Sequence, residues 1–291
     1  MSAVLTPARH LLAHVVRHPF TVGLALAVLV VIVGMAIGGA ALAPYDPEEQ
    51  ELGARLLAPG APGPSGPYWL GTDALGRDIL SLIVVGAAPA LVVSIIAVCL
   101  AALAGVMAGM LAGFRGGRYA DVLLYLTNIQ LAFPFFLLAV TIVGILRPSV
   151  PLVTGVIALG GWVRFARVTY SDTLQIRELE YIEAVRVMRG SNARILLRHI
   201  LPNVLPNVIV LATFGLSTAI VMESGLSFVG LGVPTETPTW GRMLSEGRDY
   251  MLTAWWLTVF PGLAIFLLVL AINVLGERLR DYADPKLALA A

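Results

Sequence analysis

Residues 172–202 read DTLQIRELEYIEAVRVMRGSNARILLRHILP, a polar stretch between two long apolar runs. The stretch holds four acids, and it holds seven Arg when the neighbouring Arg164 and Arg167 are included. On both sides the sequence is rich enough in Val, Ile, Leu and Ala to lie in lipid. A chain that keeps so regular a polar segment between apolar runs is expected to present it to something outside the lipid.

Composition identifies the class of protein. The chain has 291 residues, of which 58% are hydrophobic and 13% charged, and its mean hydropathy is +0.87. A soluble globular domain is about a quarter charged. We therefore expect an all-α polytopic membrane protein. The single cysteine, Cys99, lies in an apolar run, so an internal disulfide is excluded and no metal site is expected.

Long apolar runs predict about six membrane-spanning helices. The first run follows a basic segment and resembles a signal peptide, with small residues at 38–41 where cleavage is conceivable. Its apolar region is longer than the roughly 7–15 residues of a signal sequence, so a first transmembrane helix is the preferred interpretation. Pro134 predicts a kink in the third run. The six predicted spans are 21–42, 81–112, 122–146, 150–170, 204–228 and 251–274.

The distribution of basic residues predicts the orientation. Six spans put both termini on one side of the membrane, together with the 114–121 turn and the 164–202 segment. That side holds 14 of the 19 Arg and Lys residues, and the other side holds 5. The positive-inside rule places the richer side in the cytoplasm. The expected organisation is a cytosolic N-terminus (1–20), a first transmembrane helix (21–43), an extracytoplasmic loop (44–80), a five-helix core (81–276) and a cytosolic tail (277–291).

The polar stretch has a helix–break–helix pattern. Gly190 is a natural stop for a helix over 176–190. Ser191 or Asn192 can cap a second helix through Arg198, and Pro202 ends that unit and opens the fifth span. The first helix either docks in a groove of a partner protein or lies on lipid headgroups, and the pattern favours both equally. Its apolar residues at i, i+3, i+4 and i+7 predict one face: Tyr181, Ala184, Val185 and Met188.

Residues 183–203, EAVRVMRGSNARILLRHILPN, resemble the EAA loop of ABC importer permeases. In that family the loop forms the coupling helix that docks on the cytosolic ATPase subunit. Two departures matter: Val185 stands where the family has Ala, and Arg189 occupies its Gly position, with Gly190 one residue late. The end of the coupling helix is therefore left open. The expected ATPase-coupling residues are Tyr181, Glu183, Ala184, Arg186, Met188, Gly190 and Pro202.

Other motifs are similar to the oligopeptide, dipeptide and nickel permeases, and the resemblance covers about residues 20–287. An apolar anchor before the first loop is the arrangement of that group's C-type subunit. Departures include Leu82 for Arg, Ala88 and Ala90 for Arg and Ser, and Asn128 for Asp. The motifs are YWLGTDALGRDILS at 68–81, LAFP at 131–134, ESGLSFVGLG at 223–232, PTWG at 238–241 and NVLGERLRDYADPKL at 273–287.

This resemblance implies a type I ABC importer transmembrane domain in the inner membrane of a prokaryote. The implied partners are a second homologous permease, two cytosolic ATPase subunits or one fused ATPase, an extracytoplasmic substrate-binding protein, membrane lipid and a peptide, with no nucleic acid. ATP and Mg²⁺ belong to the ATPase subunits, and this chain carries no cofactor. The alternatives are a permease for nickel or another small solute, or an ion-coupled transporter or channel. The latter predicts charges inside the spans, and the first, second, third and sixth spans have none.

Two regions on the outer side are candidate gate or loop sites. Asp73 and Arg77 are spaced to pair on one helical face, and with Thr72 and Asp78 they form either a plug near the binding protein or a capped short helix. Glu223 is either an interhelical or gate contact, or a residue that only reaches the interface. Trp240 either anchors the second outer loop or is an ordinary interfacial Trp.

Catalysis on this chain is not expected. A phosphate-binding loop for ATP ends in Lys followed by Ser or Thr, whereas the only lysine, Lys286, precedes Leu287. Residues 225–228 faintly resemble the serine motif of intramembrane proteases, which requires a base within reach. All four histidines are predicted outside the spans, at His10, His14, His18 and His199. ATP hydrolysis is therefore expected on partner subunits.

Overall fold

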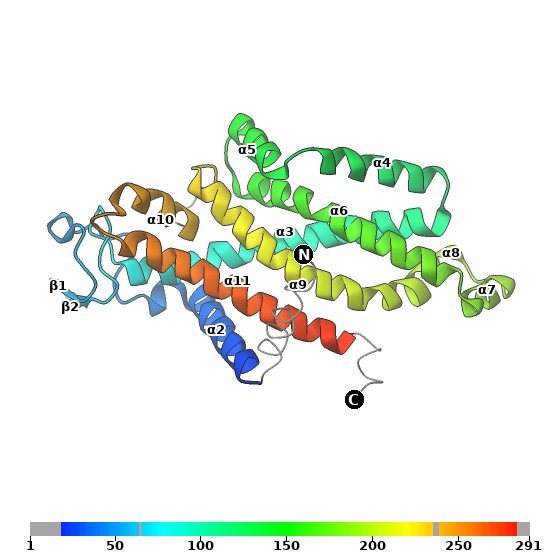
Figure 1. The fold of residues 1–291 in the computed structure, drawn as a ribbon, viewed down its shortest axis with the longest axis horizontal. Helices are drawn as coiled ribbons and strands as arrows, with labels where there is room; N and C mark the ends of the chain where they lie inside the picture. Colours follow the sequence, from blue (N-terminus) through cyan, green and yellow to red (C-terminus); the bar gives the residue numbers. More distant parts are fainter. Residues whose placement is uncertain (1–18, 64–65, 235–238, 284–291) are drawn as a thin grey trace, which may run out of the picture.

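The computed structural model describes residues 19–63, 66–234 and 239–283. Long helices lie side by side in an elongated bundle, so the all-α prediction is confirmed (Figure 1). One end of the bundle carries α7 (the α7 end), and the other carries β1 and β2 (the hairpin end). The helices are α2 Pro19–Gly38, α3 Ile79–Arg115, α4 Arg118–Ala132, α5 Phe135–Leu146, α6 Val150–Arg177, α7 Glu180–Val187, α8 Asn192–Ile195, α9 Leu201–Phe228, α10 Trp240–Gly247 and α11 Trp256–Ala283.

Short elements fill the connections. A two-stranded antiparallel hairpin, β1 Ala61–Gly63 and β2 Gly66–Tyr68, places Pro62 opposite Pro67. One π-helical turn, η3 Leu196–Ile200, joins α8 to α9. The 3₁₀ turns are η1 Gly39–Leu42, η2 Leu52–Ala54 and η4 Arg248–Tyr250.

Within the described residues, 5 helices are long and apolar enough to cross a membrane, and α4 with α5 makes a sixth span if the bent pair counts as one. The predicted number of about six therefore agrees with the fold. The predicted third span over 122–146 is broken into two helices, because α4 and α5 meet at 85°. Phe133 is extended, as residues before proline are, and Pro134 brings no N–H to continue a helix. The expected kink is a complete break.

Close contact between α3 and α6 forms the centre of the bundle. Gly105, Gly109 and Gly113 are spaced four residues apart on one side of α3. A Cβ atom at each would overlap the α6 residues Trp162 to Thr173, including their backbone. Glycines at this spacing let two membrane helices approach closely. The α3–α6 pair is thus the closely packed centre of the bundle.

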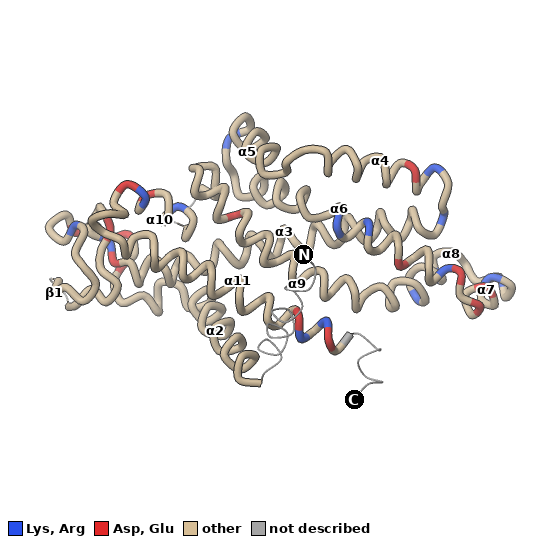
Figure 2. The backbone as a smooth tube through the Cα atoms, viewed as in Figure 1, with Lys and Arg blue, Asp and Glu red and all other residues tan. Residues whose placement is uncertain are grey.

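The ends of several predicted elements differ from the sequence-based boundaries. Helix α3 begins at Ile79 and α11 at Trp256, not at 81 and 251. Residues 277–283 continue α11, so only 284–291 of the expected tail lie outside the described residues. Residues 1–18 of the predicted cytosolic N-terminus also lie outside them. Charged residues gather at the hairpin end, at the α7 end and at the end of α11, with few elsewhere (Figure 2).

Candidate functional site

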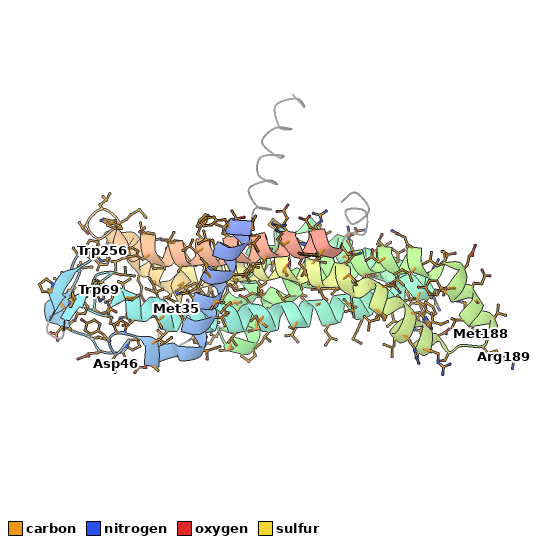
Figure 3. The ribbon with its side chains drawn as sticks, turned by 90° about the horizontal axis from the view of Figure 1, so that it is seen from below. Met35, Asp46, Trp69, Met188, Arg189 and Trp256 are labelled. Atoms are coloured by element: carbon orange, nitrogen blue, oxygen red, sulfur yellow. The ribbon has the colours of Figure 1, made fainter. Side chains whose placement is uncertain are left out.

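The polar stretch forms the tip of the α7 end, where Met188 and Arg189 lie at the extremity (Figure 3). The prediction of a helix over 176–190 was wrong at its start. Helix α6 continues to Arg177, and α7 spans only Glu180–Val187 after an extended Leu179. Residues 172–177 therefore belong to the spanning helix, and the separate helix α7 is eight residues long.

One side of α7 packs on the bundle. Ile182 is fully buried in the same hydrophobic cluster as Ile195 and Ile200, and Val185 packs against that cluster. The predicted apolar face was partly wrong, because Val185 turns inward whereas Tyr181, Ala184 and Met188 remain exposed. Helix α7 thus has an anchoring stripe of Ile182 and Val185 and an outward face. That outward face is composed of Glu180, Tyr181, Glu183, Ala184, Val187 and Met188.

The end of α7 explains the displaced glycine. Arg189, not Gly190, adopts the left-handed conformation, with φ of 57°. The Arg189 N–H donates to the Arg186 carbonyl and the Gly190 N–H to the Val185 carbonyl, both at 2.9 Å. This is a Schellman C-cap. A Cβ at Gly190 would lie 2.6 Å from Val185 Cγ1, so glycine is required there by close approach.

The chain after α7 is one helical run. Ser191 caps it, accepting from the Arg194 N–H at 3.3 Å, as predicted. Helix α9 begins at Leu201 with Pro202 in its first turn, as predicted, but the expected break before it is absent, because helical backbone continues from Asn192 to Phe228. The π turn η3 lies immediately before Pro202, where an ordinary helical bond would lack its N–H.

Polar contacts link α7 to helices α9 and α3. Asn203 Nδ2 on α9 donates to the Tyr181 hydroxyl at 3.3 Å and to the His199 carbonyl at 2.6 Å. The Arg186 guanidinium lies 5.5 Å from the ring centroid of Phe114 on α3. Arg177 Nη1 donates to the Gly113 carbonyl at 2.7 Å. Helix α7 therefore contacts the ends of α9 and α3 through Tyr181 and Arg186, and Arg177 joins the ends of α6 and α3 beside it.

At the hairpin end, residues 72–78 form a closed turn. Asp73 Oδ2 pairs with Arg77 Nε at 2.6 Å, which confirms the predicted ion pair, but the backbone is not helical. Asp73 Oδ1 accepts from the Leu75 and Arg77 N–H groups, and Gly76 has φ of 82°. Arg77 Nη2 also reaches Glu246 on α10 at 3.3 Å.

Two further residues of this turn hold it on the bundle. Asp78 caps α3 by accepting from the Ser81 N–H at 2.8 Å and the Ser81 hydroxyl at 2.7 Å. The Thr72 hydroxyl donates to the Ala54 carbonyl and accepts from the Leu57 N–H. The Thr72 carbonyl accepts from Trp256 Nε1 at 3.1 Å. The structure therefore brings the four predicted residues together. Thr72, Asp73, Arg77 and Asp78 hold the end of the 44–78 loop against the bundle.

Trp240 and Glu223 are both buried, so the interfacial interpretations were wrong. Trp240 is the first residue of α10, is fully buried, and donates from Nε1 to the Ile83 carbonyl at 2.9 Å. Glu223 is fully buried within α9. It accepts from the Ser227 hydroxyl at 2.7 Å and lies 3.5 Å from the Ser224 hydroxyl. These bonds lie within one helix, which does not support the expected interhelical contact.

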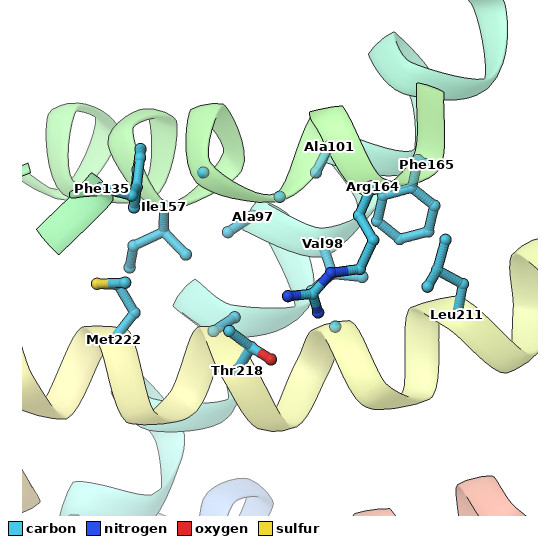
Figure 4. A pocket seen from close by; sticks show the side chains of 14 residues that line it. Ala97, Val98, Ala101, Phe135, Ile157, Arg164, Phe165, Leu211, Thr218 and Met222 are labelled. Carbon is cyan, nitrogen blue, oxygen red and sulfur yellow. The ribbon is translucent and has the colours of Figure 1, made fainter. Parts of the chain in front are cut away.

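A cavity of about 220 Å³ lies between α3, α6 and α9 (Figure 4). The Arg164 side chain points into it. The charge count placed Arg164 and Arg167 beyond the membrane, but both lie near the middle of α6. Without them the richer side holds 12 basic residues, so the asymmetry keeps its sign. This site was not predicted from the sequence, although Arg164 follows fourteen residues of predicted span, 150–163.

Arg167 has a different environment. Its Nε donates to the Thr127 hydroxyl at 3.1 Å, and its Nη2 donates to Asn128 Oδ1 on α4. On the same pair of helices, Trp162 Nε1 donates to Gln130 Oε1 at 2.7 Å. Arg167 therefore fastens α4 to α6. No group of three metal-ligating side chains occurs in residues 19–63, 66–234 and 239–283.

Comparisons with known proteins agree with this architecture. The pattern of the family described as binding-protein-dependent transport system inner membrane component matches residues 105–289. That of the N-terminal TM domain of oligopeptide transport permease C matches residues 21–59.

Several curated proteins are similar over most of the chain. The dipeptide transport system permease protein DppC of Alkalihalophilus pseudofirmus is 43% identical over 77% of this chain and 74% of its own length. The di/tripeptide transport system permease protein DppC of Pseudomonas aeruginosa is 39% identical over 90% and 87%. The glutathione transport system permease protein GsiD of Escherichia coli is 41% identical over 90% and 85%. The chain is therefore a membrane-spanning permease subunit of the binding-protein-dependent ABC importer family.

Proposed function

We propose that this permease is the C-type subunit of an importer of peptides and that α7 transmits ATP-driven motion from cytosolic ATPase subunits. The observation that carries the proposal is the two-sided construction of α7. Its inner side is anchored through Ile182, and its outer face exposes Ala184 and Val187 at the tip of the bundle. A short helix that is fixed on one side and exposes apolar residues on the other suits docking in a partner's groove.

The mechanism follows from the contacts of α7. When ATP and Mg²⁺ close two ATPase subunits, the groove that holds α7 moves. Ile182 and Asn203 carry that movement into α9, and Arg186 carries it toward α3. The bundle then exchanges between two arrangements. ATP bound to the ATPase subunits shifts the populations of these two arrangements. With a second, homologous permease, this exchange opens the path to one side of the membrane at a time.

The excess of basic residues on the side of the α7 end supports a cytoplasmic location for that end. The hairpin end then faces outward, in the inner membrane of a prokaryote. There the 72–78 turn and α10 form a compact surface for an extracytoplasmic substrate-binding protein. The printed names of the relatives, which include dipeptide, di/tripeptide and glutathione transport, support a peptide as the substrate.

The proposal is tested by ATP-driven uptake of a labelled dipeptide into proteoliposomes that contain the whole complex. Ala184→Arg places a charge on the outward face of α7 without touching the buried stripe. Ala58→Arg is the matched control, since Ala58 is also an exposed alanine but lies at the hairpin end. We expect Ala184→Arg to abolish uptake and retention of the ATPase subunits, and Ala58→Arg to retain the ATPase. Normal uptake by Ala184→Arg would refute the coupling role of α7.

A further inference from the structure

The cavity between α3, α6 and α9 contains a charged side chain from the middle of a spanning helix, that of Arg164. Arg164 lies midway between Val150 and Arg177 of α6, and its guanidinium extends toward α9 (Figure 4). Its side chain is exposed in the single chain, so the cavity is open to a ligand. The remaining lining is apolar or glycine except for one hydroxyl, that of Thr218. The lining comes from Ala97, Val98 and Ala101 on α3, Phe135 on α5, Ile157 to Phe165 on α6, and Leu211 to Met222 on α9.

Arg164 has no counter-charge within residues 19–63, 66–234 and 239–283, where it makes no hydrogen bond or ion pair. Helices α3 and α5 contain no acid, and α6 and α9 contain one each. Asp172 lies about two turns away and accepts from Asn207 at 2.9 Å. Glu223 is buried against Ser227. Neither carboxylate therefore neutralises Arg164.

A guanidinium left at membrane depth without an anion costs free energy, and such residues mark substrate paths. Its planar fork matches a carboxylate in a two-point contact. We propose that Arg164 binds the C-terminal carboxylate of the peptide in transit, while the apolar wall accepts the adjoining side chain. This inference rests on the proposed peptide transport and adds the group of the substrate that the path recognises.

The shape of the cavity agrees with one end of a peptide. Its volume of about 220 Å³ is below the roughly 300–1,000 Å³ that encloses a whole drug-sized ligand. Glycine keeps its walls open: a Cβ at Gly215 would meet only Phe165 at 3.7 Å and Val98 at 3.8 Å. A larger side chain at Gly215 would therefore extend into the cavity without disturbing the backbone.

The test compares uptake of alanyl-phenylalanine with that of its C-terminal amide, in proteoliposomes that contain the whole complex and the same binding protein. The acid-to-amide ratio in each variant is divided by the wild-type ratio, so the preference of the binding protein cancels. We expect Arg164→Gln to lower this ratio about tenfold or more, and Arg164→Lys to keep part of it. Arg167→Gln is the matched control, since it removes a cation three residues away that is held by α4, and its ratio should not change.

Each outcome separates the two proposals. If the assembled wild type takes up no peptide, the proposed function fails. If the wild type transports and Arg164→Gln keeps the wild-type ratio, the carboxylate site is refuted while the function stands. If Arg164→Gln fails to assemble with the second permease and Arg164→Lys assembles, Arg164 pairs with an acid of that subunit, which also overturns the site. Gly215→Leu keeps Arg164 and fills the cavity, and uptake at the wild-type rate by this variant would exclude a substrate there.

Discussion

Replacing Ile182 with alanine should release α7 from the bundle. The substitution removes three buried carbon atoms, for which transfer alone costs about 2 kcal/mol, and Ile→Ala changes in cores cost about 2–5 kcal/mol. Helix α7 has eight residues, fewer than the roughly 12 at which isolated helices become even marginal. Its order therefore depends on the burial of Ile182 in the cluster that also holds Ile195 and Ile200. We expect amide hydrogens of α7 to exchange about 30-fold faster or more, with loss of ATP-driven uptake.

Val187→Ala provides the control for this prediction. Val187 lies on the same helix but is 80% exposed, so its truncation should cost less than about 0.5 kcal/mol. Hydrogen exchange followed by mass spectrometry on the purified permease resolves the α7 peptide from those of α6 and α9. Unchanged protection of α7 in Ile182→Ala, or equal loss of protection in both variants, would refute the idea that Ile182 anchors the helix.

Three further predictions concern other contacts. Arg189→Gly should stabilise the permease by about 0.5–1 kcal/mol in thermal unfolding, because the left-handed conformation costs a residue with Cβ more than glycine; a lower melting temperature would argue against the cap. Gly109→Val should prevent recovery of folded protein by size-exclusion chromatography because its side chain overlaps Ala166, whereas Gly155→Val, with nothing within 4 Å, should be recovered normally. Asn128→Asp should stabilise the permease by up to about 1 kcal/mol by pairing with Arg167, seen as a higher melting temperature, and an unchanged melting temperature would show that this contact is fully solvated.

Features set by local chemistry were predictable from the sequence. The long apolar runs predict the spans, because each contains its own signal of length and composition. Ser191 caps α8 and Asp73 pairs with Arg77 because both contacts join residues only three or four apart. The position of the polar stretch at one tip was also predictable, because a polar segment that joins two spanning helices lies at the end of the bundle.

Features that depend on distant contacts or on unusual backbone conformations were not predictable. The buried Trp240 donates to the carbonyl of Ile83, which lies 157 positions earlier in the chain. Arg189 adopts a conformation that residue preferences assign to glycine. The start of α7 could not be predicted, because the helical pattern in the sequence continues from the end of α6 into α7 without an interruption. Arg164 was counted on the cytoplasmic side of the membrane because the positive-inside rule treats basic residues as markers of the membrane boundary.

The central claim is that the outward face of α7 contacts an ATPase subunit. A photoreactive side chain placed at Ala184 in the assembled complex tests this claim directly, with the same group at Ala58 as the control at the opposite end. The coupling account predicts a crosslink from position 184 to the ATPase subunit and none from position 58. Crosslinks from position 184 to lipid alone would contradict the account and would make α7 an amphipathic helix on the membrane surface.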